Sequence, residues 1–179
     1  MKLAVLSDTH GNEFSVMKAL QALGPVDGVI HLGDFAADAE TSCEKLGLPL
    51  YAVLGNCDFI RPPKGGFKNE LLLELEGAKL LLVHGHRHGV DAYSTYSARQ
   101  RAIELGADAL LYGHTHVSEV SMKDGILVLN PGSPSRPRGG REPSAALLTI
   151  ENGRLFPRIV TLWSFKTISE NRRLSPSRS

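Results

Sequence analysis

The first half of the chain alternates short, largely apolar runs with stretches of more polar character. The apolar runs occupy residues 3–6, 29–32 and 50–54. Runs without polar alternation are typical of parallel strands that are buried on both faces of a sheet. Between them, helical spacing of apolar residues predicts a helix over residues 13–23, and a second short helix is expected over residues 37–46. This order of strands and helices indicates an α/β fold.

The second half of the chain is predicted to consist mainly of strands, with one further helix. A hairpin is predicted for residues 71–76 and 79–83, and a helix for residues 91–105. The expected inward residues of that helix are Tyr93, Tyr96, Ile103 and Leu105. Further strands are expected over residues 109–112, 117–122, 126–130, 144–150 and 154–163. The pairs Asp124–Gly125 and Asn152–Gly153 have the residue types of tight hairpin turns.

The length and composition of the chain indicate a single globular domain. The chain has 179 residues, of which 42% are hydrophobic and 22% are charged, and this is enough to bury a core. We expect the domain to span residues 1–165 and a polar, basic tail to span residues 166–179. The formal net charge is only +1, so neither a membrane nor a specific nucleic acid partner is predicted. The sequence has no membrane span and two cysteines, so a cytoplasmic location is expected.

Five of the predicted strands end in clusters of glycine, histidine, aspartate or asparagine. The clusters are Asp8-Thr9-His10, Gly33-Asp34, Gly55-Asn56-Cys57-Asp58, His84-Gly85-His86 and Gly113-His114-Thr115-His116. Because ligands of open α/β sheets bind at the carboxyl ends of strands, we expect these loops to converge on one site. Carboxylate, imidazole and amide side chains suit borderline divalent metals such as Mn, Fe, Zn or Ni. Seven such groups suggest two ions that share a bridging carboxylate.

In this order, the five clusters resemble the five motifs of the calcineurin-like metallophosphoesterases. The match spans residues 8–116, and Asn130-Pro131-Gly132-Ser133 with Pro137-Arg138 extends it to residue 138. The short length and the Asn56-Cys57-Asp58 variant resemble the small YfcE-like phosphodiesterases of this family. The resemblance implies an α/β fold of the four-layer αββα sandwich type, with two mixed β-sheets and a two-metal site at one sheet edge.

The same resemblance implies a role for each of the seven candidate ligands. One ion would be held by Asp8, His10 and His116, the other by Asn56, His84 and His114, and Asp34 would bridge both. The expected cofactors are two divalent ions, with manganese preferred and nickel, iron or zinc as alternatives, and a metal-bridging hydroxide would be the nucleophile. The implied activity is hydrolysis of a small-molecule phosphodiester. Asn56 would neutralise charge on the phosphoryl oxygens, and His86 would contact phosphate or act as an acid.

One position departs from the pattern of the wider superfamily. Cys57 stands where a histidine is often thought to protonate the leaving group, and a thiol is a poor substitute for an imidazolium acid. Phosphomonoesters with alkoxide leaving groups would suffer most, so this departure favours a phosphodiesterase. A packing role is expected for Cys57, since no activating base is evident. His31 is expected in the core or behind the ligands, and His88 in a surface loop or as a second candidate acid.

Other polar residues near the motifs have structural interpretations. Asp58 is expected to cap the next segment or to orient a ligand histidine, and Asp38 is expected on a helix surface. For Ser133 and Arg138, an ordinary turn and a supporting role at the site are both open. The positive charge of Arg61 is expected to be solvated, with contact to an anionic substrate as the alternative.

Two other functions compete with the phosphodiesterase. A non-catalytic scaffold would resemble the retromer scaffold subunit, which has the same fold and binds partner proteins. Its interface would use the basic tail and the apolar residues Ile159, Val160, Leu162, Trp163 and Phe165. A phosphomonoesterase or nucleotidase would turn over monoesters well relative to diesters. The apolar strands near the C-terminus also lead us to expect a homodimer.

Overall fold

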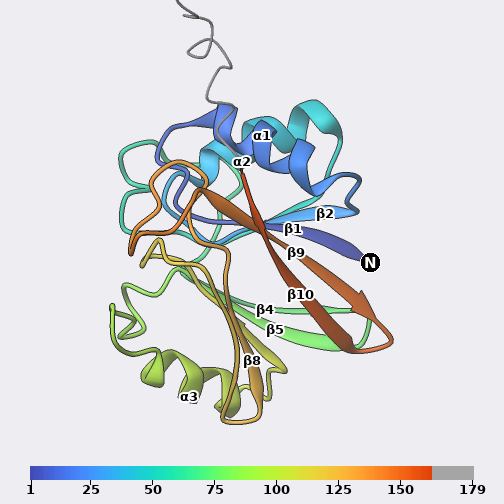
Figure 1. The fold of residues 1–179 in the computed structure, drawn as a ribbon, viewed down its shortest axis with the longest axis vertical. Coiled ribbons are helices and arrows are strands. Elements are labelled where there is room, and N and C mark those ends of the chain that lie inside the picture. The colour runs from blue at the N-terminus through green and yellow to red at the C-terminus, as the bar shows by residue number, and fades with distance from the viewer. Residues whose placement is uncertain (163–179) are drawn as a thin grey trace, which may run out of the picture.

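The computed structural model describes residues 1–162, which form two β-sheets and three helices (Figure 1). The helices are α1 (Glu13–Leu23), α2 (Ala36–Leu46) and α3 (Tyr96–Glu104). The first sheet contains β1 (Lys2–Leu6), β2 (Gly28–His31), β3 (Leu50–Ala52), β9 (Ser144–Glu151) and β10 (Arg154–Thr161). The second contains β4 (Glu70–Leu75), β5 (Ala78–Val83), β6 (Ala109–Leu111), β7 (Glu119–Lys123) and β8 (Ile126–Asn130).

Both sheets combine parallel and antiparallel pairs. In the first sheet, of order β10-β9-β1-β2-β3, the last three strands are parallel, β9 runs antiparallel to β1, and β10 runs antiparallel to β9. In the second, of order β4-β5-β6-β8-β7, the three central strands are parallel and both edge strands run antiparallel. The parallel strands of each sheet therefore bring the loops at their carboxyl ends to one edge.

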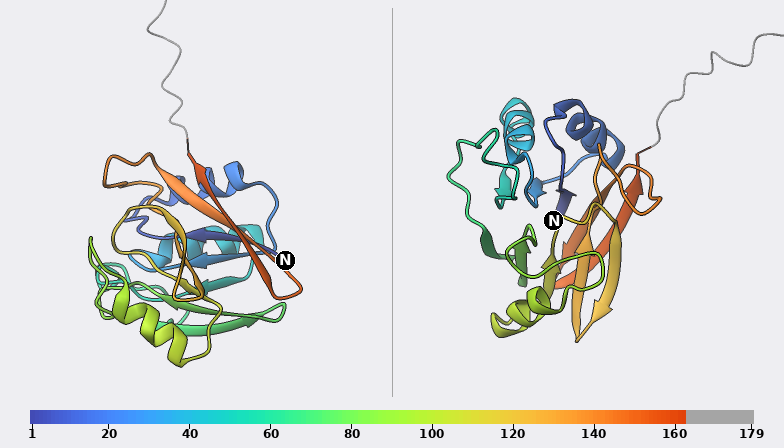
Figure 2. Two further views of the ribbon diagram at one scale, coloured as in Figure 1. Left: turned by 60° about the horizontal axis from the view of Figure 1, so that its bottom comes forward. Right: turned by 90° about the vertical axis from the view of Figure 1, so that its left-hand side faces the viewer.

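The layers are arranged as the resemblance implies. The two sheets pack face to face, with α1 and α2 on the outer face of the first sheet (Figure 2). Helix α3 packs against the outer face of the second sheet. The four-layer αββα sandwich with two mixed sheets is thus confirmed.

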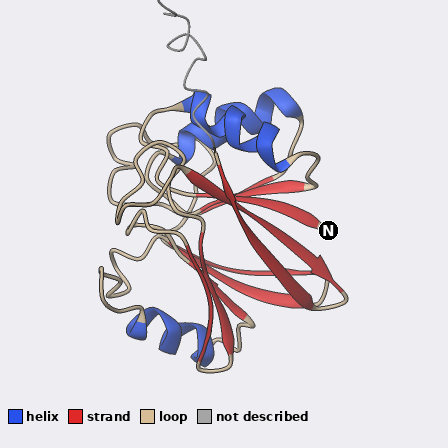
Figure 3. Ribbon diagram, viewed as in Figure 1, coloured by secondary structure: helices blue, strands red, loops and turns tan. Residues whose placement is uncertain are grey.

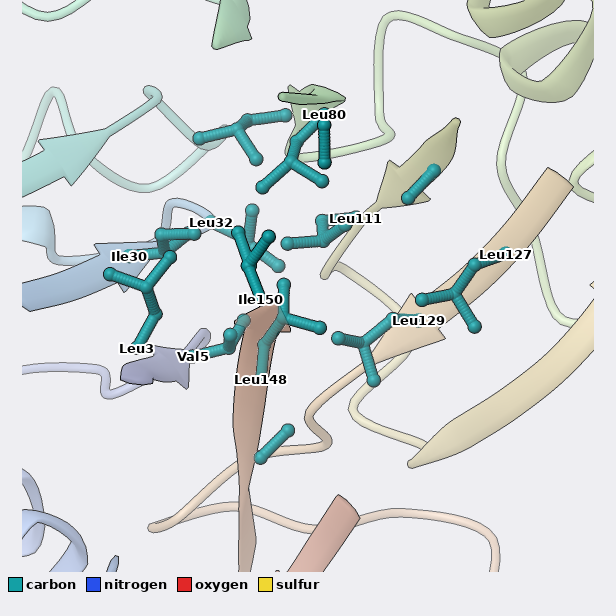
Figure 4. Packing of buried hydrophobic residues seen from close by; sticks show 14 of the residues in the cluster. Leu3, Val5, Ile30, Leu32, Leu80, Leu111, Leu127, Leu129, Leu148 and Ile150 are labelled. Atoms are coloured by element: carbon teal, nitrogen blue, oxygen red, sulfur yellow. The ribbon is translucent and has the colours of Figure 1, made fainter. Parts of the chain in front are cut away.

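The apolar runs predicted from the sequence fill cores on both faces of their sheets. In β1, Leu3 and Val5 point into the core between the sheets, while Ala4 and Leu6 pack toward the first pair of helices. All four are fully buried, and β5 divides its residues between the intersheet core and α3 in the same way. Figure 4 shows leucine and isoleucine side chains from both sheets meeting in the intersheet core. Each fully buried leucine contributes roughly 1.5–3 kcal/mol, so burial on both faces explains the absence of polar alternation.

The two predicted hairpin turns are confirmed. Asp124 and Gly125 have φ values of 52° and 82°, and Asn152 and Gly153 have 49° and 75°. Tight turns with both central residues at positive φ match the twist of antiparallel strands. These turns join β7 to β8 and β9 to β10.

The helix predicted over residues 91–105 is wrong in its start and in most of its inward residues. The Asp91 carboxylate accepts hydrogen bonds from the backbone N–H groups two and three residues further on, at 2.7 and 2.8 Å, and this turn delays the helix to Tyr96. The buried residues of α3 are Ala98 and Ala102, whose small side chains let it approach the sheet. Of the predicted inward residues only Leu105 packs against the core, whereas Tyr93 is 98% exposed.

Smaller differences concern the ends of elements. Strand β3 ends at Ala52 rather than at residue 54, and β7 begins at Glu119 rather than at residue 117. The predicted domain boundary at residue 165, the tail over 166–179, and Trp163 and Phe165 lie outside the described residues. No helix within residues 1–162 is long and apolar enough to cross a membrane.

Candidate metal centre

The five polar clusters lie together at one edge of the sandwich. They follow β1, β2, β3, β5 and β6, and the loops gather on the left-hand side of Figure 3, beyond the carboxyl ends of these strands. Parallel pairing of β1 with β2 and β3, and of β5 with β6, places these ends side by side. The convergence predicted from the sequence is therefore confirmed.

The first group of ligand candidates is compact. Asp8, His10, Asp34 and His116 each offer one donor atom, and these atoms all lie within 4.8 Å of one another. Nε2 of His116 lies 3.2 Å from Oδ1 of Asp8 and 3.2 Å from Nε2 of His10. The side chains of Asp8 and His116 are almost completely buried. This group has the size and the donor types of a single divalent-metal site.

The second group adjoins the first through Asp34. Nε2 of His84 lies 3.2 Å from Oδ1 of Asn56 and 3.5 Å from Oδ1 of Asp34, and the His84 and His114 rings are 5.1 Å apart. The other oxygen of Asp34, Oδ2, lies 3.7 Å from Nε2 of His10. The two carboxylate oxygens of Asp34 thus face different groups, the arrangement that a bridging ligand requires.

Backbone carbonyls orient two of the imidazoles for metal binding. Nδ1 of His84 donates to the carbonyl oxygen of Leu32 at 2.7 Å, and Nδ1 of His116 donates to that of Arg136 at 2.6 Å. In the neutral rings this leaves an unprotonated Nε2 that points into the cluster. A carbonyl partner on the far nitrogen is the usual support for a metal-binding histidine.

The electrostatics of the cluster call for a cation between its donors. Burial would raise the pKa of Asp8, but the contact with His116 and the nearby His84 hold this pKa below its ordinary value. Burial likewise opposes the charged form of His116, yet Asp8 raises its pKa above the ordinary value. Oδ1 of Asp8 is buried and accepts no hydrogen bond of regular geometry in the described part of the chain. A divalent ion between Asp8 and His116 would replace the proton that the carboxylate favours on the imidazole, so the residues present fit a metal.

The backbone at the candidate ligands is strained. Nine non-glycine residues among residues 1–162 have positive φ. Five of them are the candidate ligands Asp8, His10, Asp34, His114 and His116, and three others lie in hairpin turns. Left-handed conformations are unfavourable for residues with a Cβ atom and concentrate at functional sites. The surrounding fold therefore holds these side chains in a conformation that the free loops would not favour.

Buried polar residues behind the ligands tie the loops together. His31, expected to lie in the core or behind the ligands, accepts from the Gly33 N–H at Nδ1, so its Nε2 donates to Oγ1 of Thr9. Complete burial lowers the pKa of His31 to about 4, which keeps it neutral in this bridge. The Asp58 carboxylate accepts three backbone N–H groups, from Asp34, Gly55 and the first residue of α2. Asp58 therefore caps the start of α2 and the loops before it, rather than the next segment as expected.

The segment that follows β8 supports the site. Oγ of Ser133 donates to the carbonyl oxygen of Asp8 at 2.8 Å, and Oγ of Ser135 donates to that of Thr9 at 2.9 Å. This favours the supporting role over an ordinary turn for Ser133. The sequence reading missed Ser135 and the carbonyl of Arg136, because a backbone acceptor or a loop serine carries no distinctive signal.

The prediction that Asp38 lies on a helix surface is wrong. Its side chain is fully buried, accepts the backbone N–H of Gly11 at 2.9 Å and pairs with Arg61 at 3.0 Å. Arg61 also pairs with Glu13 at 2.6 Å, so its charge is not freely solvated as expected. These contacts join loops that are distant in the sequence, which is why neighbouring residues gave no indication of them.

His88, expected in a surface loop, lies 3.0 Å from the carboxylate of Glu70.

The remaining predicted residues differ in how well they suit acid chemistry. The His86 ring lies 5.3 Å from that of His84, and burial together with His84 and Arg87 lowers its pKa to about 4. A neutral imidazole is a weak proton donor, so this environment favours contact with phosphate over the acid role. Burial and the neighbouring Asp34 raise the pKa of Cys57 to about 11, which argues against a thiolate nucleophile.

Comparisons with known proteins agree with this geometry. Residues 1–153 match the family model described as the calcineurin-like phosphoesterase superfamily domain. A probable metallophosphoesterase of Bacillus subtilis, YsnB, is 40% identical over 85% of this chain and 86% of its own length. The Escherichia coli phosphodiesterase YfcE is 28% identical over 83% of this chain and 87% of its own.

A solved structure gives the same result for the fold. The crystal structure of a predicted phosphoesterase from Streptococcus pneumoniae superposes with a TM-score of 0.73 and 31% identity, covering 89% of this chain and 88% of that one. The family match covers all five clusters and therefore the whole candidate metal centre. The chain belongs to the calcineurin-like phosphoesterase superfamily, and it is a phosphoester hydrolase of the metal-dependent kind.

Proposed function

We propose that the protein is a phosphodiesterase that uses two divalent ions, with manganese as the expected metal and nickel, iron or zinc as alternatives. The observation that carries this proposal is the pair of donor groups that share Asp34, whose two oxygens face His10 and His84. When bound, two such ions would supply a bridging hydroxide as the nucleophile and would neutralise charge on the phosphoryl group. A scaffold has no need of such a set, and no predicted ligand is missing here.

Two side chains at the edge of the second group are proposed to handle the phosphoryl group. Asn56 is exposed on the loop after β3, with Oδ1 directed to His84 and its amide nitrogen 3.3 Å from the sulfur of Cys57. His86 lies beside His84 and is only partly buried. Both are placed to contact oxygens of a substrate bound at this group, where their hydrogen bonds would orient it.

The cavities around the site support a diester over a monoester. One cavity of about 720 Å³ is lined in part by His114. A separate cavity of about 490 Å³ is lined in part by Asn56 and His86. A phosphodiester carries two organic arms, and each cavity offers space for one of them, whereas a monoester would leave one cavity empty.

The proposal predicts manganese-dependent hydrolysis of bis(para-nitrophenyl) phosphate by the purified full-length protein. The released nitrophenolate is followed by absorbance, and para-nitrophenyl phosphate serves as the monoester comparison. We expect the diester to be turned over with the higher kcat/KM, and a chelator to abolish both reactions. Substoichiometric metal after reconstitution, together with no turnover, would support the scaffold instead. A higher kcat/KM for the monoester would support a phosphomonoesterase.

Cys57→His is expected to raise monoesterase kcat/KM by about tenfold or more, because a positioned imidazole can protonate an alkoxide leaving group. The backbone N–H of Cys57 donates to Oδ1 of Asp34 at 2.7 Å, and this bond does not depend on the side chain. Cys57→Ser is the matched control, since a hydroxyl has no acidic proton near neutral pH. No gain in the histidine variant, with metal content intact, would remove our explanation of this position.

A further inference from the structure

The larger cavity at the metal centre carries an unpartnered positive charge. It is lined by His114 of the second donor group, by Arg138 and Arg141 of the loop before β9, and by Tyr93 and Asp91 of the loop before α3. We propose that this cavity, the arginine cavity, binds a second anionic group on one arm of the substrate. The inference rests on the proposed function, because it assumes that the phosphoryl group lies at the donor group containing His114.

The charges that line the arginine cavity leave its two arginines available. The Glu119 carboxylate forms an ion pair with Lys123 and accepts a hydrogen bond from the Tyr112 hydroxyl. The Asp91 carboxylate caps a turn by accepting two backbone N–H groups. The guanidinium groups of Arg138 and Arg141 make no ion pair with any residue between 1 and 162, and both residues are exposed. An anion entering the cavity therefore meets two cations that have no protein partner.

The loop that carries these arginines is fixed to the metal centre. The backbone N–H of Arg138 donates to the carbonyl oxygen of His116 at 3.1 Å, and that of Arg141 donates to the carbonyl of Arg138 at 3.1 Å. Nδ1 of His116 in turn donates to the carbonyl of Arg136. The backbone that carries both arginine side chains is therefore hydrogen-bonded to His116, a candidate metal ligand. A cation anchored in this way discriminates between substrates better than a charge on a free loop, since less conformational freedom is lost on binding.

The second cavity does not offer the same chemistry. Its lining includes the aromatic rings of Phe59 and Phe67 and the prolines Pro62 and Pro63. Its one arginine, Arg87, already donates from Nε to His86 at 3.3 Å. This cavity suits an apolar or aromatic arm. The two cavities together select an unsymmetrical phosphodiester, with the anionic arm on the side of Arg138 and Arg141.

Isothermal titration calorimetry of two phosphonates tests this inference without catalysis. Propylphosphonate carries one anionic head, and propylene bisphosphonate adds a second anion at the end of a short arm; neither has a bond that the enzyme can hydrolyse. The titrations use the manganese-loaded full-length protein. Exposed ion pairs are individually weak, so we expect the bisphosphonate to bind about tenfold more tightly than the monophosphonate. The double substitution Arg138→Gln with Arg141→Gln is expected to reduce this ratio to about one.

Two further variants distinguish a specific site from general charge. Arg138→Lys with Arg141→Lys keeps both charges and should retain most of the preference. Arg154→Gln removes an exposed arginine from the start of β10, at the end of the first sheet away from the ligand loops, and should leave the ratio unchanged. An equal affinity for both phosphonates in the wild-type protein would overturn the inference, as would a preference that survives in the double glutamine variant. The affinity ratio is measured without catalysis, so it tests the arginine cavity separately from the proposed function. The protein can turn over the diester and yet show no preference for the bisphosphonate, and it can show the preference without turning over the diester.

Discussion

Asp34→Asn is expected to lower the kcat/KM for bis(para-nitrophenyl) phosphate by about a thousandfold or more in the presence of manganese. Asparagine keeps the shape of the side chain but removes its negative charge, and only one of its two terminal atoms can bind a metal. The carboxylate is the contact between the two donor groups, with Oδ2 near His10 and Oδ1 near His84. Elemental analysis should show loss of metal in parallel with the loss of activity.

Asp27→Asn provides the matched control for the aspartate variant. Asp27 is exposed, and within residues 1–162 its carboxylate accepts only the backbone N–H of Lys2, outside the metal centre. The control removes the same charge and should retain activity and full metal content. A correctly folded Asp34→Asn protein that keeps its activity would contradict the proposed mechanism.

Gly33→Ala is expected to destabilise the protein by about 3 kcal/mol or more. Gly33 has a φ of 92°, which disfavours any residue with a Cβ atom. A Cβ atom at this position would lie 2.6 Å from the backbone nitrogen of Gly55 and 2.9 Å from Nδ1 of His84. Because the first neighbour is backbone, the loops after β2 and β3 would have to separate. Urea denaturation of the variant and the wild-type protein measures the difference in the free energy of unfolding.

Gly106→Ala separates the two contributions to this effect. Gly106 also has positive φ, at 65°, but an added Cβ would meet nothing within 4 Å. Only backbone strain remains, so the control should cost about 1 kcal/mol. If Gly33→Ala and Gly106→Ala lowered the free energy of unfolding equally, close packing against the loop of Gly55 would not be the reason for a glycine at position 33.

The sequence allowed much of the secondary structure and the whole candidate ligand set to be predicted. The predicted helix over residues 13–23 coincides with α1, and both predicted hairpin turns occur where expected. These features leave a local signal in the sequence, namely the spacing of apolar residues and a glycine after a residue that tolerates positive φ. The seven candidate ligands could be named because the polar clusters that follow the apolar strands match, in order, the motifs of the calcineurin-like metallophosphoesterases.

The errors fall where local and tertiary preferences differ. Tyr93 and Tyr96 suggested an apolar helix face, but α3 uses Ala98 and Ala102 because only small side chains let it lie close to the second sheet. Asp38 was expected on the surface of its predicted helix, but it is fully buried. Its partner Arg61 lies 23 residues away, and that contact exists only once the loop after β3 has folded back.

The sequence by itself determined which strands form, in what order they follow one another, and which polar side chains stand at their ends. Only the tertiary structure decided that the two oxygens of Asp34 face different donor groups, that His31 bridges two ligand loops, and that Arg138 and Arg141 line a cavity beside His114. The physical reason is the range of the forces involved. The pattern of apolar positions and the dihedral preferences of turns are contained within a few residues, whereas hydrogen bonds such as that from His116 to Arg136 and that from Ser133 to Asp8 require segments that meet only when both sheets are assembled.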